Sequence, residues 1–222
     1  MMELLLMDGD ELKDPELFEK ALLLVEETRR SGVEKLRKEE SKRLSLAAGL
    51  LLRYAFLSVN ELSLYNKIEV TAKGKPFLRS NEYFFSLSHS GEVAICAFSD
   101  GPVGCDIEKH REKVPEKRKK IFSSHEENIF QTLDESEQIP FFFQLWTSKE
   151  SSTKLIGKGI SYPFESFTVM DSQEAKGCIN LEGRQLFLKS FQIENYTISL
   201  SAETPEFPRE IKFLACSALM KN

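Results

Sequence analysis

The chain has 222 residues, of which 41% are hydrophobic and 29% are charged, and its net charge is −5. This length can bury a substantial core, and the acidic balance argues against a general nucleic-acid-binding protein. No apolar run approaches the roughly 20 residues of a membrane span, and the apolar start Met1–Met7 is too short for a signal peptide and lacks basic residues. Four scattered cysteines, without zinc-site spacing to the histidines, fit reduced thiols. We therefore expect a cytoplasmic protein that binds neither nucleic acid nor membrane.

The first part of the chain predicts a strand followed by two helices. Leu4-Leu5-Leu6 is typical of a strand, and Asp14-Pro15 supplies a helix N-cap and a first-turn proline. A second helix is expected from about Glu39 to Leu57, with a buried stripe made of Leu44, Ala47, Leu51 and Ala55. Basic residues gather between the two helices, and a solvated helical face explains most of them: Arg29, Arg30, Lys35, Arg37, Lys38, Lys42 and Arg43.

The middle of the chain predicts a turn and then three consecutive strands. Glycine and proline in Lys73–Phe77 indicate the turn. Phe84–Gly91 is a strand that runs into a hairpin, and Val93–Phe98 is a buried apolar strand. A third strand, Val103–Glu108, follows an Asp-Gly-Pro turn.

Two acidic residues of this third strand are the first candidate functional residues. Asp106 and Glu108 are two apart, so on a strand they point the same way. Neighbouring carboxylates repel and raise each other's pKa unless a cation lies between them. Mg²⁺ is the simplest such cation, because it binds few protein carboxylates and leaves room for phosphates and water. A solvated strand edge can also carry such a pair, so the pair alone does not decide.

The rest of the chain predicts a loop, two helices and further strands. Lys109 to Lys120 is polar and basic and predicts a loop. Ser123–Glu126 has the form of a capping box that opens a short helix, and a longer helix is expected from near Pro140 to just before Gly157. Strands of a second sheet are predicted at Phe167–Met170, Leu186–Lys189, Tyr196–Leu200 and Lys212–Cys216.

The longer helix carries the second set of candidate residues. Glu150 and Lys154 are four apart and therefore share one helix face. They could be an ordinary exposed ion pair, worth a few tenths of a kcal/mol. Alternatively, Glu150 completes a three-carboxylate metal site and Lys154 neutralises an anionic substrate, which suits phosphoryl chemistry.

Taken together, these two stretches resemble the 4′-phosphopantetheinyl transferases, in particular their larger, monomeric, surfactin-synthetase-activating type. The family pattern is aliphatic-Gly-aliphatic-Asp-x-Glu, then about forty residues later Trp-(Ser/Thr/Cys)-x-Lys-Glu-(Ser/Ala)-x-x-Lys. Val103–Glu108 matches the first part and Trp146–Lys154 the second. Cys105 replaces an aliphatic residue, but cysteine behaves as a small hydrophobe.

The resemblance implies an α+β fold of two similar halves. Each half would be a small antiparallel sheet with a long helix packed on it, and a pseudo-twofold axis would relate them, with the active site in the cleft. Residues 1–102 would form the half that binds the nucleotide end of coenzyme A. Residues 103–222 would form the half with the metal site and the Trp-x-x-Lys-Glu helix. A monomer is expected.

The resemblance also implies the reaction. The 4′-phosphopantetheine group of coenzyme A would be transferred to a serine of an apo acyl or peptidyl carrier protein, with release of adenosine 3′,5′-bisphosphate. Asp106, Glu108 and Glu150 would hold Mg²⁺, with Mn²⁺ as an alternative. Glu150 would remove the serine proton, directly or through a water, and Lys154 would offset the charge of the leaving group.

Further positions match the family's coenzyme A ligands. Ser88-His89-Ser90 matches its Ser-His-Ser, and Gly74-Lys75-Pro76 matches its Gly-Lys-Pro. Imidazolium suits a phosphate because its pKa lies near neutrality. One basic residue near the start of the second helix is also implied; it is Arg43, or Lys42 if the alignment slips by one. The expected ligands of coenzyme A are Arg43, Lys75, Ser88, His89, Lys149 and Lys154.

A docking site for the carrier is expected next to the metal strand. Carrier proteins of such systems are commonly acidic around their serine, and the segment Lys109 to Lys120 has seven basic residues against two acidic ones. Lys117, Arg118 and Lys120 are the expected contacts. A loop whose charges only confer solubility is an equal alternative.

Two other functions share parts of this pattern. A coenzyme A or nucleotide-binding module could keep the fold without catalysis, although Glu150 and Lys154 are intact. A metal-dependent phosphodiesterase or nuclease could use the acidic cluster, but it would not need the Ser-His-Ser and Gly-Lys-Pro segments.

Overall fold

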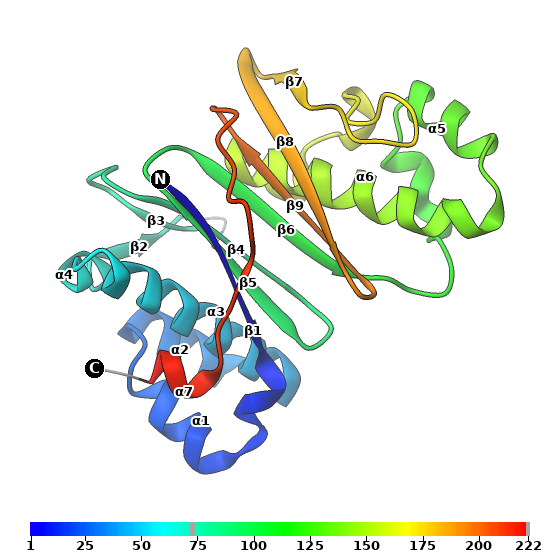
Figure 1. Ribbon diagram of the computed structural model, residues 1–222. Coiled ribbons are helices and arrows are strands. Elements are labelled where there is room, and N and C mark those ends of the chain that lie inside the picture. The colour runs from blue at the N-terminus through cyan, green and yellow to red at the C-terminus, as the bar shows by residue number, and fades with distance from the viewer. Residues whose placement is uncertain (72–73, 221–222) are drawn as a thin grey trace. The chain divides into compact units, whose positions relative to one another are not determined.

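The computed structural model describes residues 1–71 and 74–220. The chain divides into two compact units, which we call unit 1 (Met1–Asp100 with Pro208–Asn222) and unit 2 (Gly101–Phe207). Each unit contains a four-stranded sheet and one long helix, so the predicted α+β class is confirmed (Figure 1). The expected division into 1–102 and 103–222 differs from the structure at its end, because residues 208–222 belong to unit 1. In the part of the chain that the structure describes, no helix is long and apolar enough to cross a membrane.

Unit 1 begins with the predicted strand and helices. The side chain of Asp14 accepts hydrogen bonds from the backbone of Glu16 and Leu17, which confirms the predicted cap. The elements in order are β1 (Met2–Asp8), the 3-10 helix η1 (Gly9–Lys13), α1 (Pro15–Leu22), α2 (Glu27–Lys35), α3 (Glu39–Ser58) and α4 (Leu62–Tyr65).

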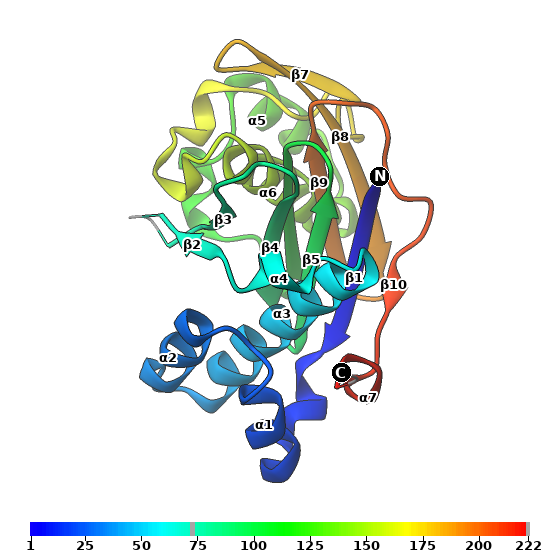
Figure 2. The ribbon, with the colours of Figure 1, turned by 90° about the vertical axis from the view of Figure 1, so that its left-hand side faces the viewer.

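The core of unit 1 lies between α3 and the sheet. Helix α3 packs against β1, β4 and β5 (Figure 2). The predicted stripe on α3, made of Leu44, Ala47, Leu51 and Ala55, is buried. Phe56 is fully buried and contacts the rings of Tyr65, Tyr83, Phe85 and Phe98.

The sheet of unit 1 has the order β10-β1-β5-β4. Strands β4 (Phe84–Ser90) and β5 (Val93–Ser99) confirm the predicted hairpin. Strand β10 (Lys212–Phe213) pairs in parallel with β1, so the assignment of Lys212–Cys216 to the second sheet was wrong. The remaining elements are a two-stranded sheet of β2 (Ile68–Val70) and β3 (Pro76–Leu78), and helix α7 (Cys216–Leu219).

Unit 2 contains an antiparallel sheet of order β6-β9-β8-β7. Three of its strands, β6, β8 and β9, cover predicted segments, whereas the strand predicted at Phe167–Met170 is wrong. The described residues form only an isolated bridge there, between Met170 and Ala175. The strands are β6 (Val103–Lys109), β7 (Cys178–Leu181), β8 (Arg184–Ile193) and β9 (Tyr196–Ala202).

Two helices of unit 2 begin with capping boxes. Ser123 and Glu126 form the predicted one, which opens α5 (Ser124–Gln131). Asp134 and Glu137 form a second box, so α6 (Glu135–Leu155) begins before Pro140 rather than at it. Pro140 lies inside the helix, where it removes one backbone hydrogen bond. Short 3-10 helices complete the unit: η2 (Glu116–Lys120), η3 (Gly159–Ser161) and η4 (Phe164–Ser166).

Helix α6 packs on the sheet of unit 2 and contributes to an aromatic core. It lies against β6, β9 and β8 (Figure 1). Its N-terminal half contributes phenylalanines to a buried cluster that includes Phe122, Phe130, Phe141, Phe142 and Phe143.

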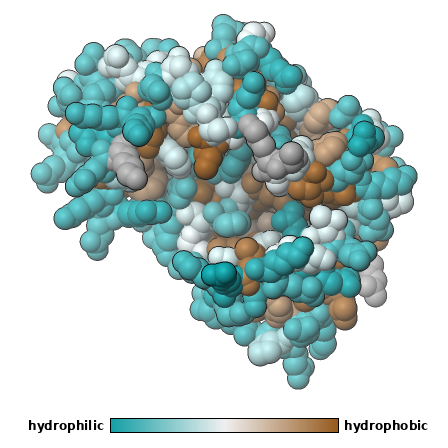
Figure 3. All heavy atoms as spheres, turned by 180° about the vertical axis from the view of Figure 1, so that it is seen from behind, coloured by the Kyte–Doolittle hydropathy of each residue, from teal (hydrophilic) through white to brown (hydrophobic). Residues whose placement is uncertain are grey.

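The face of the molecule in Figure 3 carries mainly hydrophilic side chains, as expected for a chain with 29% charged residues.

Candidate functional site

Strand β6 and helix α6 bring together the candidate catalytic residues of unit 2. Lys154 Nζ lies 2.6 Å from Asp106 Oδ1. The Asp106 side chain is 6% exposed and that of Lys154 is 26% exposed, so this is a largely buried pair rather than an ordinary surface one. Burial lowers the pKa of Lys154, but Asp106 and its other acidic neighbours outweigh burial and raise it overall. Lys154 is therefore a fixed positive charge at this site.

Glu150 is the titratable group of the site. Glu150 is almost fully buried, with 5% of its surface exposed. Burial, followed by the charge of Asp106, raises the pKa of Glu150 from 4.5 to about 7; Lys154 opposes the shift and Glu108 adds to it. The three carboxylates predicted from sequence are therefore close enough to influence one another. A carboxylate with a pKa near neutrality can accept a proton at physiological pH.

The side chain of Glu108 is held by a tryptophan of α6. Trp146 Nε1 donates a hydrogen bond of 3.2 Å to Glu108 Oε1. The indole also contacts the rings of Phe142 and Phe164. A rigid, packed donor therefore orients the second carboxylate of the Asp-x-Glu pair.

The donor chemistry at this site fits a hard divalent cation. Asp106, Glu108 and Glu150 offer carboxylate oxygens, which Mg²⁺ prefers, and their mutual repulsion is what a cation would relieve. Over residues 1–71 and 74–220, however, no three His, Cys, Asp or Glu side chains are already gathered in a geometry that could hold a metal ion. The ammonium of Lys154 is instead the cation that contacts Asp106.

Gly104 allows α6 to approach β6 closely enough for Lys154 to pair with Asp106. A Cβ atom at position 104 would lie 2.0 Å from Ser151 O and 2.9 Å from Leu155 N. Both are backbone atoms of α6, which cannot move aside as a flexible side chain could. The glycine of the Gly-x-Asp segment is therefore required by packing.

Lys149 does not face a ligand, which corrects its assignment as a coenzyme A contact. The side chain is 0% exposed and pairs at 2.6 Å with Glu126 Oε2, which is also 0% exposed. Its ammonium donates to the carbonyl oxygens of Ile121, Phe164 and Phe167 at 2.7 to 2.8 Å. Three ammonium protons are thus used by four internal acceptors. Burial lowers the pKa of Lys149 and Glu126 opposes that shift.

Glu126 is the residue of this ion pair that sequence reasoning missed. Its Oε1 accepts from the backbone of Val169 and Met170, and its Oε2 accepts from Ser123 N in the capping box. These bonds also explain why Phe167–Met170 is not a strand, since a carboxylate takes the N–H groups that a ladder would use. The capping box was visible in the sequence, but the second role of its glutamate carried no signal.

Unit 1 contains the residues expected to bind coenzyme A. Ser88 and His89 are consecutive on β4, pair with Ile95 and Ala94 of β5, and therefore point to opposite faces. Ser88 is buried and His89 is exposed. His89 directly precedes Ser90, where β4 ends, and Ser88 lies one residue further back. Of the two side chains, only that of His89 is on the open face of the strand.

The other expected ligands of unit 1 are partly engaged within the protein. Arg43 Nη2 lies 3.6 Å from Asp10 Oδ1, and the alternative ligand, Lys42, pairs with Glu39 at 2.7 Å. Lys75 is half-buried at the hairpin before β3, where its carbonyl accepts from Thr71 N. Lys73, the first residue of the predicted turn, lies outside the described residues.

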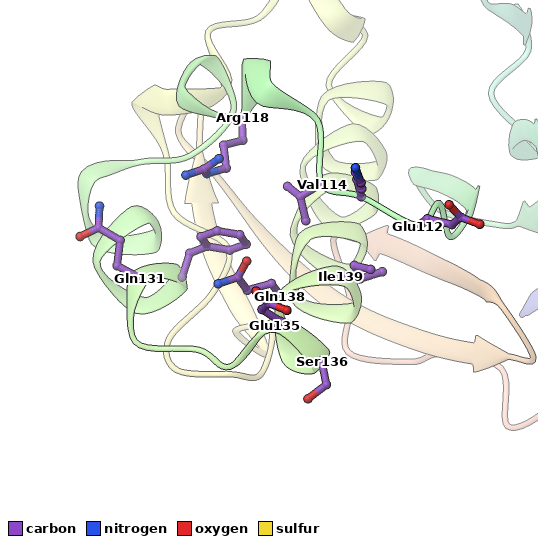
Figure 4. A pocket seen from close by; sticks show the side chains of 10 residues that line it. Glu112, Val114, Arg118, Gln131, Glu135, Ser136, Gln138 and Ile139 are labelled. Atoms are coloured by element: carbon purple, nitrogen blue, oxygen red, sulfur yellow. The ribbon is translucent and has the colours of Figure 1, made fainter.

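In the segment predicted as a loop, Lys109 to Lys120, the first residue ends β6 and Glu116–Lys120 form the 3-10 helix η2. The segment borders a pocket of about 850 Å³. Figure 4 shows Arg118 and Gln131 on one side of this pocket and Val114 and Ile139 on the other. The guanidinium of Arg118 lies 4.9 Å from the centre of the Phe130 ring, and it is 3.6 Å from a carboxylate oxygen of Glu127. Lys120 is exposed, and the side chain of Lys117 lies outside the described residues.

Comparison with known proteins identifies a family. Residues 102–201 match the model of the 4′-phosphopantetheinyl transferase superfamily. The 4′-phosphopantetheinyl transferase Sfp of Bacillus subtilis (strain 168) is 34% identical over 151 residues, which are 66% of this chain and 67% of the relative. The transferase psf-1 of Bacillus pumilus is 28% identical over 199 residues, 87% of this chain and 85% of the relative. The transferase gsp of Aneurinibacillus migulanus is 38% identical over 133 residues, 58% of this chain and 54% of the relative.

The family match covers one part of the candidate residues. It contains Asp106, Glu108, Glu150 and Lys154, and it begins after the Ser-His-Ser segment. The four candidate residues of unit 2 therefore lie inside the matched region, and the candidate ligands of unit 1 lie outside it.

Proposed function

The chain belongs to the 4′-phosphopantetheinyl transferase superfamily and is an enzyme of that class, and we propose that it transfers 4′-phosphopantetheine from coenzyme A to a serine of an apo acyl or peptidyl carrier protein. The observation that carries this proposal is that Glu150, whose pKa is raised to about 7, is within electrostatic influence of Lys154, whose positive charge is held beside Asp106. A base with a pKa near the working pH and a neighbouring cation are the two groups that this transfer needs.

In the proposed reaction Glu150 accepts the proton of the carrier serine, directly or through a water. The serine oxygen forms a bond to the β-phosphorus of coenzyme A, and the bond from that phosphorus to the bridging oxygen breaks. Adenosine 3′,5′-bisphosphate leaves with that oxygen. Lys154 offsets the charge that develops on the leaving phosphate, and the buried surroundings of Asp106 strengthen that electrostatic effect.

We propose that Asp106, Glu108 and Glu150 hold Mg²⁺, with Mn²⁺ as the alternative. When bound, the ion would neutralise the pyrophosphate and help to orient it. The hydrogen bond from Trp146 keeps Glu108 directed into the site. Because Lys154 contacts Asp106 in the structure, the lysine must share or release that carboxylate when an ion binds.

Four residues of unit 1 are proposed ligands of coenzyme A: Arg43, Lys75, Ser88 and His89. The exposed imidazole of His89 suits the 3′-phosphate, because a dianion favours the charged ring. Arg43 lies 3.6 Å from the carboxylate of Asp10, so it would have to share or release that carboxylate to hold a phosphate. We also propose that the protein works in the cytoplasm as a monomer.

The carrier is proposed to dock on the segment from Lys109 to Lys120. Its excess of basic residues complements an acidic partner, and the pocket beside it offers the apolar side chains of Val114, Phe130 and Ile139. Lys117, Arg118 and Lys120 are the proposed contacts.

One experiment tests the transfer and separates it from the alternatives. An apo carrier protein is incubated with coenzyme A, Mg²⁺ and the enzyme, and its mass is measured. We expect the mass to rise by one phosphopantetheine group. An unchanged carrier, with coenzyme A still bound by the protein, would favour the non-catalytic binding module. Cleavage of coenzyme A or of a nucleic acid without carrier modification would favour a phosphodiesterase or nuclease.

The metal site is tested separately. Asp106→Ala should abolish Mg²⁺-dependent transfer. Circular dichroism should show an intact fold, with some loss of stability because Lys154 loses its largely buried partner. Full activity of Asp106→Ala, or of the unchanged protein in excess EDTA, would refute the metal assignment.

A further inference from the structure

Buried hydroxyl groups join α6 to the sheet beside the candidate catalytic residues. Ser199 of β9 lies at their centre, with its Oγ 2.7 Å from Thr147 Oγ1 and 3.2 Å from Ser148 Oγ, both on α6. Ser190 Oγ of β8 approaches Ser199 Oγ from another side at 2.9 Å. Thr147, Ser148 and Ser199 are all 0% exposed. One hydroxyl therefore connects a helix and two strands, and we call these four hydroxyls the serine node.

The carbonyl at the end of the serine node gives its bonds a direction. Thr147 Oγ1 donates to Phe143 O at 2.8 Å, and a hydroxyl has one proton to give. Thr147 must then accept from Ser199, and Ser199 in turn accepts from Ser148 and Ser190. Each hydroxyl of the node donates once, so the bonds form one consistent chain rather than a set of interchangeable contacts.

The serine node lies at the level of the candidate catalytic residues. Ser199 is the register partner of Asp106 in the pairing of β6 with β9. On the helix, Thr147 and Ser148 lie within one turn of Glu150. The node is therefore located where the carboxylate of the sheet and the functional groups of the helix meet.

Small side chains at this seam do not interlock the helix with the sheet. Gly104 of the sheet lies against the backbone of α6 at Ser151 and Leu155, and Ser201 Oγ lies beside Gly104. Neither position carries a large side chain that could fill a groove between the elements. Directional hydrogen bonds are then the interaction that can fix how far α6 is shifted along the strands.

We propose that Ser199 is a positioning residue whose hydroxyl sets the register of α6 on the sheet and thereby holds Glu150 and Lys154 beside Asp106. The catalytic consequence rests on the proposed function, whereas the register itself is a property of the fold. A displacement of about 1 Å between reacting groups can lower a rate by about 100-fold.

Three variants test this role. Ser199→Ala removes the central hydroxyl, and Thr147→Val removes the partner on the helix while keeping its shape. Ser201→Ala is the matched control, because Ser201 is buried on the same face of β9 and its Oγ has no hydrogen-bond partner among the described residues. All three changes remove one hydroxyl from the same seam.

Two readouts are compared. The first is the steady-state kinetics of transfer, with kcat and the KM for coenzyme A determined separately. The second needs neither substrate nor metal: the chain has one tryptophan, and the Trp146 indole N–H donates to Glu108 across the boundary between α6 and β6. Its single indole signal in ¹H–¹⁵N NMR therefore reports the register directly.

We expect Ser199→Ala and Thr147→Val to lower kcat by about 10- to 100-fold, with the KM for coenzyme A nearly unchanged and the indole signal displaced. Ser201→Ala should match the unchanged protein in both readouts. An unmoved indole signal in Ser199→Ala, whatever its kcat, would overturn the inference, and so would equal effects of Ser201→Ala. If the unchanged protein modifies no carrier, the proposed function fails, while the indole comparison still decides the positioning role.

Discussion

Lys149 and Glu126 place a full pair of charges inside unit 2. Each side chain is 0% exposed, and hydrogen bonds from or to the backbone satisfy both. Such pairs are weak contributors compared with apolar packing, but removing one partner leaves the other charge buried without compensation. The pair therefore links α5 and α6 to each other and to the chain around Phe167.

Replacing this lysine tests that role. Lys149→Met keeps the length of the side chain but leaves Glu126 and three carbonyl oxygens without their donor, so we expect the free energy of unfolding to fall by about 3–5 kcal/mol. Urea denaturation measures it. The control is Lys20→Met, because Lys20 is 67% exposed and pairs with Glu16 at 3.9 Å; it should change stability by less than about 0.5 kcal/mol. Equal losses in the two variants would contradict a structural role for Lys149.

Glu150 makes stability depend on pH. Its folded-state pKa of about 7 lies above the usual 4.5, so the folded state binds the proton more tightly than the unfolded state. The stabilisation from this proton is present below about pH 4.5 and is lost as the pH rises through about 7. Glu150→Gln, unfolded in urea with EDTA present, should therefore be more stable than the unchanged protein at pH 8. The difference should shrink at pH 5, and a difference independent of pH would contradict the raised pKa.

His89 is expected to distinguish the two ends of coenzyme A. If its exposed imidazole contacts the 3′-phosphate, His89→Ala should weaken coenzyme A by more than it weakens 3′-dephospho-coenzyme A. Isothermal titration calorimetry with both ligands measures the two losses. Equal losses would mean that His89 acts elsewhere or supports β4.

Two elements, β6 and α6, pack backbone against backbone at Gly104. A Cβ there would come within 2.0 Å of Ser151 O, so Gly104→Ala must push the helix away. We expect a loss of stability of about 3 kcal/mol and a fall in kcat, since Lys154 and Glu150 would move with α6. Thermal denaturation and the transfer assay measure these effects. Gly101→Ala is the control, because a Cβ at Gly101 meets nothing within 4 Å, and comparable damage there would refute the packing explanation.

Most elements could be predicted from local patterns, and the exceptions have identifiable causes. The capping box of Ser123 and Glu126 correctly predicts the start of α5. Pro140 predicts a later start of α6 than the structure has, because Asp134 and Glu137 form the capping box of that helix. Strand β10 was assigned to the wrong sheet because its partner, β1, lies at the other end of the chain. Local sequence carries no information on so distant a pairing.

The candidate site could also be predicted only in part, because local sequence does not show which side chains become buried. The spacing of the two acidic motifs predicted Asp106, Glu108, Glu150 and Lys154, whose charges the structure brings close together. Lys149 was placed wrongly because a lysine in a motif gives no sign of its burial. The polar residues Thr197, Ser199 and Ser201 alternate along β9 as on a solvated strand, yet they are 0% exposed against α6.

For the whole molecule, net charge and local charge have opposite signs. The chain is net acidic, so an acidic carrier should be repelled at long range, but screening limits such effects to about 8 Å at physiological salt. The basic segment from Lys109 to Lys120 can therefore govern encounter.

Charge reversal tests this docking surface. Changing Lys117, Arg118 and Lys120 to Glu should raise the KM for an acidic carrier and weaken its salt dependence, while the KM for coenzyme A and kcat change little. Because Arg118 also contacts Glu127 and Phe130, the double variant Lys117→Glu/Lys120→Glu separates docking from local packing. An unchanged carrier KM at low salt in both variants would assign the segment to solubility.

The return of residues 208–222 to unit 1 has a consequence for synthesis. Unit 2 is one continuous stretch of chain, but unit 1 needs its last segment, in which β10 pairs with β1 and the buried Cys216 donates its backbone N–H to Glu11. A ribosome makes the chain from its N-terminus, and domains fold as units during synthesis. Unit 2 can therefore complete its fold while unit 1, although begun first, still exposes the edge of β1. Unit 1, whose first residues are synthesised earliest, is therefore the unit that completes its fold last.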